Sequence, residues 1–370
     1  MKRGLFLVWF LFFTTLYGIT LSQKYPSYKY VLQEFDIDTN YINEPEFVRF
    51  VTNNEDKYRS FYKNSLKRGK AYIPMFKDLL VSGGLSHLFV YMSMTESGFQ
   101  TYAKSSKQAA GLWQFMSATA KRFNLRVDEH IDQRYDPIAS TEAAMKYIQT
   151  LYRMFGKWYL VMMAYNCGEG RLQKAIKMAR SDDFVTLMSE DKKYLPLETT
   201  RYLQKIILLS MMGERIRTST KKEEKKIKEE ILPSTEILVN VYGGITLQQI
   251  ANMIDVNVGE LYRLNPQIKG GKIPNSVSMT QIFIPAKKLE RFKAFYRPPT
   301  LQEIFKKRGY SKLVAHIVKK QDTLKEIARN YHSTVLDIII ANELPNEYLK
   351  LGQVIMVPVS NRVYEERLTY

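Results

Sequence analysis

The segment Met94-Thr95-Glu96-Ser97-Gly98-Phe99 places an ionisable carboxylate at the end of the apolar run Leu85-Ser-His-Leu-Phe-Val-Tyr-Met-Ser-Met94. We expect this run to form a buried helix. A glutamate at the end of a buried helix is desolvated, and desolvation raises the pKa of a carboxyl group. A raised pKa would let Glu96 hold its proton near neutral pH, as a general acid must. For an isolated glutamate, the simpler interpretation is a surface residue at a helix end.

Two later motifs favour the general acid: Gly111-Leu-Trp-Gln-Phe-Met116 and Ala164-Tyr-Asn-Cys-Gly-Glu-Gly170. The surrounding sequence, from residue 73 to about 213, has a helical pattern. Its clearest part is the segment 140–155, where apolar residues recur at three- and four-residue spacing and predict a helix. Asp136-Pro137 marks the start of that helix.

The composition describes a globular chain with a basic surface. With 370 residues the chain is long enough for two or more domains. Aromatic residues make up 13% of it, which is typical of chains with packed cores and argues against disorder. The net charge of +18 favours a polyanionic partner, namely nucleic acid, an anionic membrane or an acidic cell-wall polymer. Charge alone does not distinguish these three.

The N-terminus has the pattern of an export signal. Lys2 and Arg3 precede a short apolar run, residues 5–13, and a small, polar stretch follows over residues 14–22. This order predicts a signal peptide, and the apolar run is too short for a comfortable transmembrane span. An uncleaved anchor is the alternative. The stretch of residues 14–22 directly after the run contains no cysteine, so we expect no bacterial lipoprotein anchor, and export argues against nucleic acid as a partner.

Cysteine and histidine usage gives no sign of a metal or redox centre. The single cysteine, Cys167, excludes an intrachain disulfide, and its place in an Asn-Cys-Gly turn favours a small, half-buried residue over a nucleophile. The four histidines show no metal-ligand spacing: His87, His130, His316 and His332. We therefore expect neither a metal site nor a cofactor.

The C-terminal part contains an internal repeat at an offset of 77 residues. Each copy begins its first predicted helix with a capping box, Thr246-x-x-Gln249 or Thr323-x-x-Glu326. Each copy ends in a β-branched run closed by proline. We therefore predict the order strand, helix, helix, strand for both copies. The matched positions include Val239-Asn-Val241 with His316-Ile-Val318, Ile250-Ala251 with Ile327-Ala328, Leu261 with Ile338, and Asn265 with Asn342.

These motifs resemble known families. Glu96-Ser-Gly-Phe99, Gly111-Leu-Trp-Gln-Phe115 and Ala164-Tyr-Asn-Cys-Gly-Glu-Gly170, in this order, resemble the catalytic domain of lytic murein transglycosylases of the soluble-lytic-transglycosylase (SLT) type. Asp132-Gln-Arg-Tyr-Asp-Pro137 and Leu195-Pro-Leu-Glu-Thr-Thr-Arg-Tyr202 fit later motifs of that family. The two repeats resemble LysM modules. The second is the clearer, and the first is degenerate because Gly243-Gly244 replaces the usual polar turn.

The resemblance implies an α+β multidomain fold, in which a mainly α-helical, lysozyme-like catalytic domain precedes two small βααβ LysM-like modules. The charged stretch before the first repeat and the Pro298-Pro299 stretch between the repeats are expected to be linkers, the second with a short helix. The expected division is a signal peptide or anchor (1–22), a helical lead-in (23–74), the catalytic domain (75–213), a charged linker (214–235), the degenerate module (236–286), a linker (287–312) and the second module (313–359).

The resemblance also implies an activity. It is non-hydrolytic cleavage of the β-1,4 bond between N-acetylmuramic acid (MurNAc) and N-acetylglucosamine (GlcNAc), which gives a 1,6-anhydroMurNAc end. Glu96 would be the single general acid and base, and no second acidic residue follows it before Asp128. Two positions depart from the family pattern, because Gln108 replaces a usual glycine and Cys167 a usual Ala or Ser. The implied substrate-binding residues are Ser105, Gln114, Phe115, Tyr165, Asn166 and Glu198.

Two alternatives remain open. A hydrolytic muramidase of goose-lysozyme type shares the fold and the glutamate acid. A non-catalytic wall-binding protein with an inert cleft would have no need of a desolvated acid. The implied partners are peptidoglycan glycan strands, GlcNAc-containing glycan at the LysM modules and a membrane surface. The implied location is the bacterial periplasm or cell envelope.

Overall fold

The computed structural model describes residues 19–70, 72–214, 236–274, 279–342, 344 and 349–368. The expected signal peptide or anchor (1–22) and charged linker (214–235) therefore lie outside the described residues, apart from residues 19–22 and 214. The chain divides into two compact units, which are described separately. The first contains residues 1–64, 84–95 and 148–231, and the second contains residues 65–83, 96–147 and 232–370.

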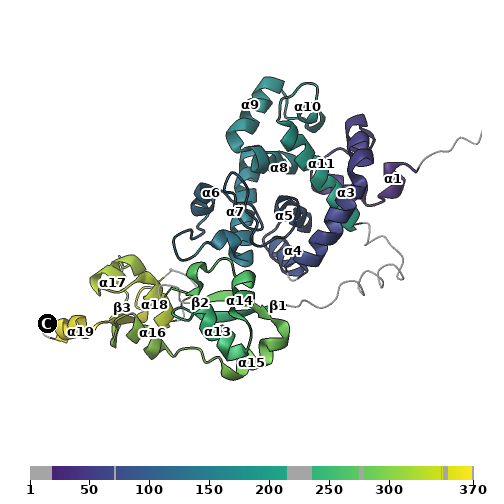
Figure 1. Cartoon of the computed structure of the whole chain (residues 1–370). Coiled ribbons are helices and arrows are strands. Elements are labelled where there is room, and N and C mark those ends of the chain that lie inside the picture. Colours follow the sequence, from purple (N-terminus) through teal and green to yellow (C-terminus); the bar gives the residue numbers. More distant parts are fainter. Residues whose placement is uncertain are drawn as a thin grey trace, which may run out of the picture. The chain divides into compact units, whose positions relative to one another are not determined.

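The described part of the first unit is helical (Figure 1). Its last helix, α11, is buried along most of its length, with Glu198 and Arg201 exposed near its start. Ser27, at the start of α2, donates a hydrogen bond from Oγ to Met211 O on α11. The elements that lie wholly or partly in this unit are α1 (Leu21–Lys24), α2 (Tyr28–Glu34), η1 (Thr39–Asn43), α3 (Pro45–Gly69), η2 (His87–Phe89), α5 (Val90–Ser97), α7 (Pro137–Phe155), α8 (Trp158–Cys167), α9 (Glu169–Ala179), α10 (Phe184–Met188) and α11 (Leu197–Glu214).

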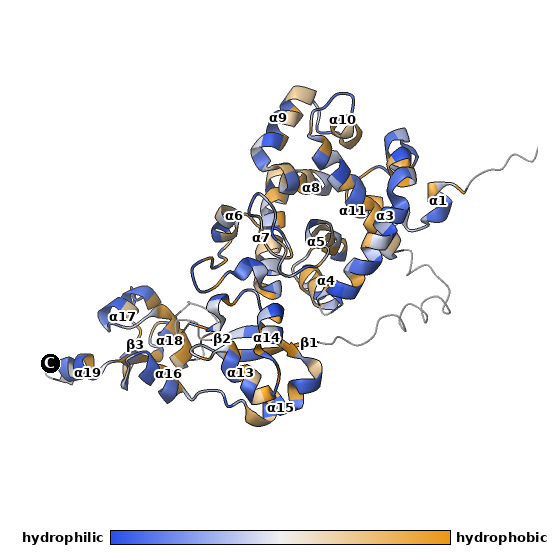
Figure 2. Ribbon diagram, viewed as in Figure 1, coloured by the Kyte–Doolittle hydropathy of each residue, from blue (hydrophilic) through white to orange (hydrophobic). Residues whose placement is uncertain are grey.

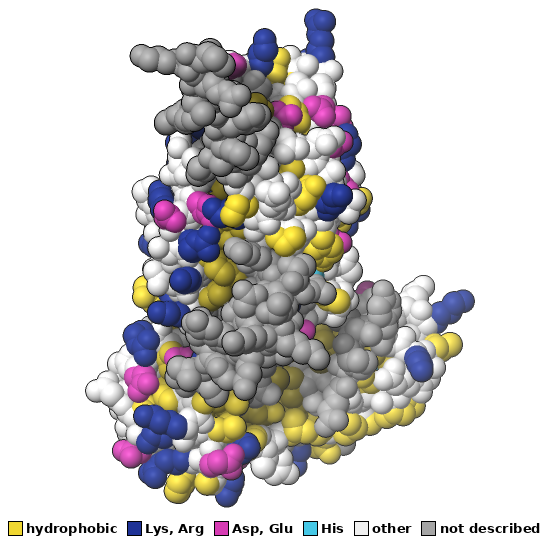
Figure 3. Space-filling model, turned by 90° about the vertical axis from the view of Figure 1, so that its right-hand side faces the viewer, with side chains coloured by type: hydrophobic (Ala, Val, Ile, Leu, Met, Phe, Trp, Pro, Cys, Tyr) yellow, Lys and Arg dark blue, Asp and Glu magenta, His cyan; other side chains and the backbone are white. Residues whose placement is uncertain are grey.

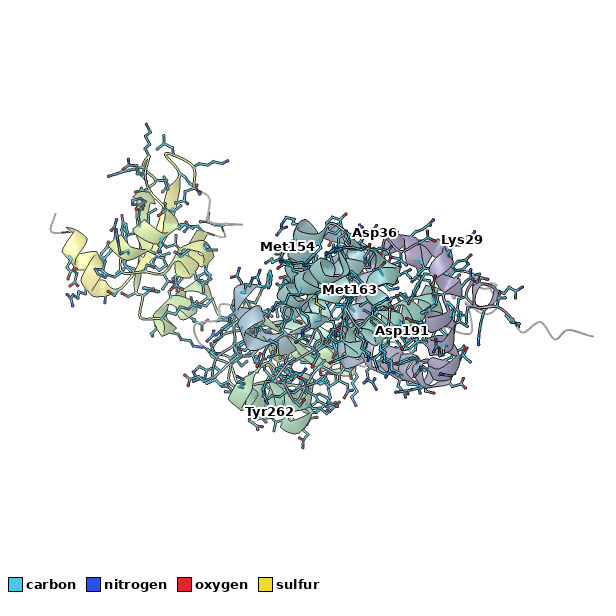
Figure 4. All side chains as sticks on the ribbon, turned by 90° about the horizontal axis from the view of Figure 1, so that it is seen from above. Lys29, Asp36, Met154, Met163, Asp191 and Tyr262 are labelled. Carbon is cyan, nitrogen blue, oxygen red and sulfur yellow. The ribbon has the colours of Figure 1, made fainter. Side chains whose placement is uncertain are left out.

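Two of these helices differ in how they are buried. The middle of α8 is buried from Tyr159 to Ala164, and Met163 is labelled there in Figure 4. In contrast, α3 carries both hydrophilic and hydrophobic residues along its length (Figure 2), as expected of a helix with one face toward a core. The last turn of α8 forms the first part of the third motif, residues 164–170.

The second unit begins with helices and ends with two sheet-containing modules. Its helical elements are α4 (Ile73–Ser82), α6 (Ser117–Arg122), η3 (Gln133–Tyr135) and the N-terminal part of α7. The remaining elements are β1 (Glu236–Tyr242), α13 (Leu247–Ile254), α14 (Val258–Leu264), η5 (Lys269–Gly271), β2 (Met279–Pro285), η6 (Ala286–Lys288), α15 (Leu289–Phe295), α16 (Leu301–Lys307), β3 (Lys312–Ile317), α17 (Leu324–Asn330), α18 (Val335–Asn342), β4 (Val354–Val359) and α19 (Asn361–Leu368).

The helix predicted over residues 140–155 is confirmed as α7. Its start has a physical cause: Asp136 Oδ1 accepts hydrogen bonds from the N–H groups of Ile138 and Ala139, both at 3.0 Å. These bonds satisfy donors that a helix start leaves open. Burial raises the pKa of Asp136, although the two N–H groups act in the opposite direction.

The predicted order of the repeats is confirmed in both modules. The first runs β1, α13, α14, β2 and the second β3, α17, α18, β4. Each strand pair is antiparallel, with Val239 opposite Ile282 in the first and Val314 opposite Val357 in the second. Both capping boxes are formed, at Thr246 and at Thr323. The fold class expected from the sequence, a mainly helical part followed by two small βααβ modules, is therefore correct.

The stretch between the modules differs from expectation. It contains two short helices, α15 and α16, where a single short helix was predicted. Helix α15 places Phe292 in the core of the first module, so this part packs as an extension of that module. After α16, Arg308 forms an ion pair with the buried Asp337 of α18.

Candidate active site

Glu96 is the penultimate residue of α5 and is half-buried. The chain turns sharply after this helix, because Gly98 and Phe99 both have left-handed backbones, with φ of 57° and 59°. Arg68 Nε donates to Gly98 O at 2.7 Å, and the Phe99 ring is buried near that of Phe76. A left-handed conformation costs a non-glycine residue energy, so these contacts are needed to hold the turn. The helix end that carries Glu96 is thus fixed.

A buried hydroxyl joins the first and second motifs. Ser97 Oγ donates to Leu112 O at 3.0 Å and accepts from the Phe99 N–H at 3.1 Å. Next to Leu112, the Trp113 side chain is fully buried, and its Nε1 donates to Thr141 Oγ1 on α7 at 2.8 Å. The second motif is therefore anchored on one side to the residue after Glu96 and on the other to α7.

The loop of residues 105–115 is held together by its own polar groups. Ser105 Oγ accepts a hydrogen bond from the Ala109 N–H at 3.0 Å. Gln114 Nε2 donates to Ala103 O at 3.2 Å and to Gly111 O at 2.8 Å. Ser105 and Gln114, expected to contact substrate, thus also shape the loop.

Two features of this loop explain residue choices in the sequence. Gln108 has a left-handed backbone with φ of 67°, so a conformation natural to glycine is kept although glycine is absent. Gly111 has φ of 79°, and a Cβ added there would lie 1.7 Å from Arg134 O. Glycine at position 111 therefore permits the close approach of the two backbones.

Phe115 contributes to the core. Its ring is only 2% exposed, and its backbone exchanges two hydrogen bonds of 3.0 Å with Ala110. A ring this buried presents little surface to a sugar, so its contribution is to anchor the loop of residues 105–115 to the core.

The first unit holds the third motif. Tyr165 and Asn166 are half-buried in the last turn of α8. Asn166 Oδ1 accepts a hydrogen bond from Thr199 Oγ1 of α11 at 2.8 Å, which fixes the orientation of the amide. Glu198 is exposed in the first turn of α11, so the hydrogen bond to Asn166 comes from its neighbour Thr199.

The surroundings of Cys167 and Gly168 indicate structural roles for both residues. Burial raises the pKa of the Cys167 thiol, although Arg171 acts in the opposite direction, so the thiolate is disfavoured. Gly168 has φ of 89° and separates α8 from α9. Cys167 is thus the small, half-buried residue that its turn predicted.

Sequence reasoning missed the roles of Asp132 and Arg134. Arg134 Nε and Nη2 donate to the two carboxylate oxygens of Asp132 at 2.9 and 2.7 Å, and Nη1 donates to Gln108 O and Phe115 O at 3.0 and 3.2 Å. The hydrogen bond to Asp132 raises the pKa of Arg134. One buried guanidinium thus holds the loop of residues 105–115 at two points, Gln108 and Phe115. The opposite charges two residues apart were the available signal.

Metal binding and membrane spanning find no support in the part of the chain that the structure describes. It holds no group of three or more His, Cys, Asp or Glu residues suited to a metal ion. None of its helices has the length and apolar character needed to cross a membrane. On the face shown in Figure 3, Lys and Arg side chains are scattered among other side chains, so the positive charge there is spread out.

Three family models match the chain. Residues 76–187 match the transglycosylase SLT domain. Residues 237–299 match the LysM-like domain of lytic transglycosylase MltD, and residues 316–358 match the LysM domain.

Similar proteins carry related names. Membrane-bound lytic murein transglycosylase D of Escherichia coli (strain K12) is 27% identical over 314 residues, which is 80% of this chain and 65% of that protein. The chain thus spans about two thirds of that relative's length. Peptidoglycan transglycosylase gp16 of Escherichia phage T7 is 34% identical over 34% of this chain and 10% of its own. The crystal structure of the 70 kDa soluble lytic transglycosylase SLT70 from Escherichia coli is 24% identical, covering 40% of this chain and 25% of that one, with a TM-score of 0.33.

Proposed function

We propose, on the premise that this chain carries a transglycosylase SLT domain followed by an MltD-type LysM-like domain and a LysM domain, that it is a peptidoglycan lytic transglycosylase. The observation that carries the proposal is the hydrogen bond from Ser97 Oγ to Leu112 O. It ties the helix end that presents Glu96 to the loop of the second motif. General acid catalysis requires a carboxyl group held in a fixed place, and these contacts supply that.

In the proposed reaction, Glu96 is the single acid and base. Its carboxyl group protonates the glycosidic oxygen between MurNAc and GlcNAc, and the bond from that oxygen to C1 of MurNAc breaks. The Glu96 carboxylate then takes the proton of the MurNAc C6 hydroxyl, whose oxygen bonds to C1 and closes the 1,6-anhydro ring. The substrate's N-acetyl group stabilises the cationic centre in between. No water is consumed, so the second carboxylate of most glycosidases is not needed.

The other proposed site residues bind and position the substrate. Tyr165 offers a ring face and a hydroxyl group to the sugar, and Asn166 offers the donors of an amide already oriented by Thr199. Glu198 is exposed at the start of α11, and its proposed role is to accept a hydrogen bond from glycan hydroxyl groups. Ser105, Gln114 and Phe115 act mainly through the shape of the loop.

The proposed partner is the peptidoglycan strand itself. The two LysM-type modules would bind GlcNAc-containing glycan and keep the polymer near the catalytic domain. The net charge of +18 would add attraction to anionic glycopeptide or membrane lipid, and this attraction should weaken with salt. The proposed location is the periplasm or cell envelope.

The test is digestion of purified peptidoglycan by the wild type, by Glu96→Gln and by Glu142→Gln, with products read by mass spectrometry. Glu142 is an exposed carboxylate on α7 and is the matched control. We expect anhydromuropeptides from the wild type and the control, and a loss of roughly 100-fold or more in Glu96→Gln. Reducing ends in place of anhydro ends would show a hydrolytic muramidase. Binding without cleavage would show a wall-binding protein, and either result overturns the proposal.

A further inference from the structure

One set of contacts has no part in the proposed chemistry. The loop of residues 127–132, between α6 and η3, pairs with residues 267–269 of the first LysM-like module, and both segments belong to the second compact unit. Ile131 and Ile268 form an antiparallel bridge. The Asp132 N–H donates to Gln267 O at 3.0 Å, and the Lys269 N–H donates to His130 O at 2.8 Å. Backbone pairing of this kind fixes register as well as distance.

Side chains reinforce this pairing. Ile131 and Ile268 are 4% and 3% exposed, so the bridge is apolar at its centre. Lys269 Nζ donates to Asp128 O and lies 4.0 Å from Asp132 Oδ2. Away from the bridge, the ring of Tyr72, just before α4, meets that of Phe283 on β2 edge to face with centroids 5.2 Å apart. Two separate contacts resist rotation of the module better than one.

One ion pair connects this docking contact to the loop of residues 105–115. Asp132, whose backbone N–H bonds to the module, holds the Arg134 guanidinium with both carboxylate oxygens. Arg134 in turn donates to Gln108 O and Phe115 O. In the sequence, Leu112 lies between these two residues, and its backbone oxygen accepts the hydrogen bond from Ser97 Oγ. The series thus alternates hydrogen bonds with short stretches of covalent chain.

The first LysM-like module differs from the second module in the segment that contacts the loop of residues 127–132. In both modules an asparagine at the end of the second helix bonds to the last strand, from Asn265 to Phe283 and from Asn342 to Met356. The partners are 18 residues apart in the first module and 14 in the second. The docking residues lie in this longer segment. It turns at Gly270 and Gly271, and a Cβ on Gly271 would meet the hydroxyl of Tyr262, labelled in Figure 4, at 2.1 Å.

We propose that the first LysM-like module docks through residues 267–269 on the loop of residues 127–132 and acts as a positioning element for the loop of the second motif. Its partner is thus the catalytic domain of the same chain. Asp132 and Arg134 are positioning residues that pass the contact on. The kinetic part of this proposal rests on the proposed function, whereas the docking part does not.

The variant Lys269→Pro tests the docking in the full chain. Proline removes the N–H that donates to His130 O, together with the lysine side chain. Ile268 has φ of −95° and ψ of 93°, an extended conformation that suits a residue before proline, and position 269 begins a helical turn, where proline fits. Lys269→Ala keeps the N–H donor and is the matched control for the side chain.

The first measurement is residue-resolved hydrogen exchange. We expect the Asp132 amide to be protected in the wild type and to exchange about tenfold or more faster in Lys269→Pro, with a smaller change in Lys269→Ala. The Gln133 amide, which bonds to Arg126 O within the same loop, and the Phe283 amide inside the module should be unchanged. An unprotected Asp132 amide in the wild type, or equal exchange in wild type and Lys269→Pro, overturns the docking. This result is independent of activity.

The second measurement is steady-state cleavage of solubilised glycan strands. A positioning role predicts that Lys269→Pro lowers kcat about threefold to tenfold with KM nearly unchanged. A module that serves only to bind glycan predicts the reverse, a higher KM at constant kcat, and would overturn the positioning role. If the wild type cleaves nothing, the proposed function fails while the exchange result still decides the docking.

Discussion

The side-chain amide of Asn265 forms two hydrogen bonds with the backbone of Phe283. Its Nδ2 donates to Phe283 O at 2.9 Å, and its Oδ1 accepts from the Phe283 N–H at 2.7 Å. Asn342 bonds in the same way to Met356, at 2.7 and 2.6 Å. In each module this amide ties the end of the second helix to the last strand.

Replacing this asparagine should destabilise its own module. Asn265→Leu has a similar volume but leaves the N–H and C=O of Phe283 without these partners, at a cost of about 2–4 kcal/mol. Hydrogen exchange across β1 and β2 in the full chain measures the effect. Asn252→Ala, at an exposed position on α13, is the control and should change stability by less than about 0.5 kcal/mol. Equal effects of the two variants would contradict a role for the Asn265 hydrogen bonds.

Gly111→Ala should disrupt the loop of the second motif. The new Cβ would lie 1.7 Å from Arg134 O, so the backbone of one segment has to move, and φ of 79° adds strain. Gly84→Ala is the matched control, because its φ of 75° is similar but nothing lies within 4 Å of the new Cβ. We expect a loss of about 3 kcal/mol or more for Gly111→Ala and about 1 kcal/mol for the control, measured by thermal unfolding. Similar losses would mean that strain alone matters.

Thr199→Val should reduce activity more than stability. Valine keeps the shape of threonine but cannot donate to Asn166 Oδ1, so the amide is free to rotate. We expect cleavage to fall about tenfold, the equivalent of about 1.4 kcal/mol, and Thr199→Ser to restore most of it. Thr200→Val, which loses a hydrogen bond to Leu197 O in the same turn, is the control for the helix start. If Thr199→Ser fails to recover activity, loss of the hydroxyl group is not the cause of the lower cleavage in Thr199→Val.

Glu55 should make stability depend on pH on the acid side. Burial acts to raise its pKa, but hydrogen bonds from Lys24, Tyr25 and Arg59 outweigh it, and the pKa lies below its ordinary value of 4.5. A carboxylate with a lowered pKa in the folded state stabilises the fold above its ordinary pKa, and this stabilisation is lost as the pH falls through the folded value.

Melting temperatures of the wild type and Glu55→Gln between pH 7 and pH 3 test this expectation. The variant should be less stable at pH 7, and the difference should shrink once the pH falls below about 4.5. Asp56→Asn, at the exposed neighbouring position, is the control and should follow the wild type. A constant difference across this range would show that the interaction is not with the charged form.

Features set by neighbouring residues could be predicted from the sequence. The capping boxes at Thr246 and Thr323 need only residues three positions apart, and the turn at Asp136 needs two neighbouring N–H groups. The βααβ order followed from the repeat for the same reason. These elements form because local preference and tertiary packing agree.

Features set by distant residues could not be predicted. Phe115 was expected in the cleft, but whether an aromatic ring faces solvent or core depends on what packs beneath it. The roles of Arg134 and Thr199 depend on carbonyl and amide groups brought near by folding. The pairing of residues 131 and 268 joins segments far apart in the sequence, which no pattern in either segment could reveal.

The asparagine bonds in the two modules reach only backbone atoms of the partner residue. The side chain of that residue is therefore not fixed by the bond, and it is phenylalanine in one module and methionine in the other. A module that retains this amide can therefore change what the last strand packs against and still keep the bond between helix and strand. The same backbone frame can thus carry different side chains, and in the first module that side chain is the Phe283 ring that meets the ring of Tyr72.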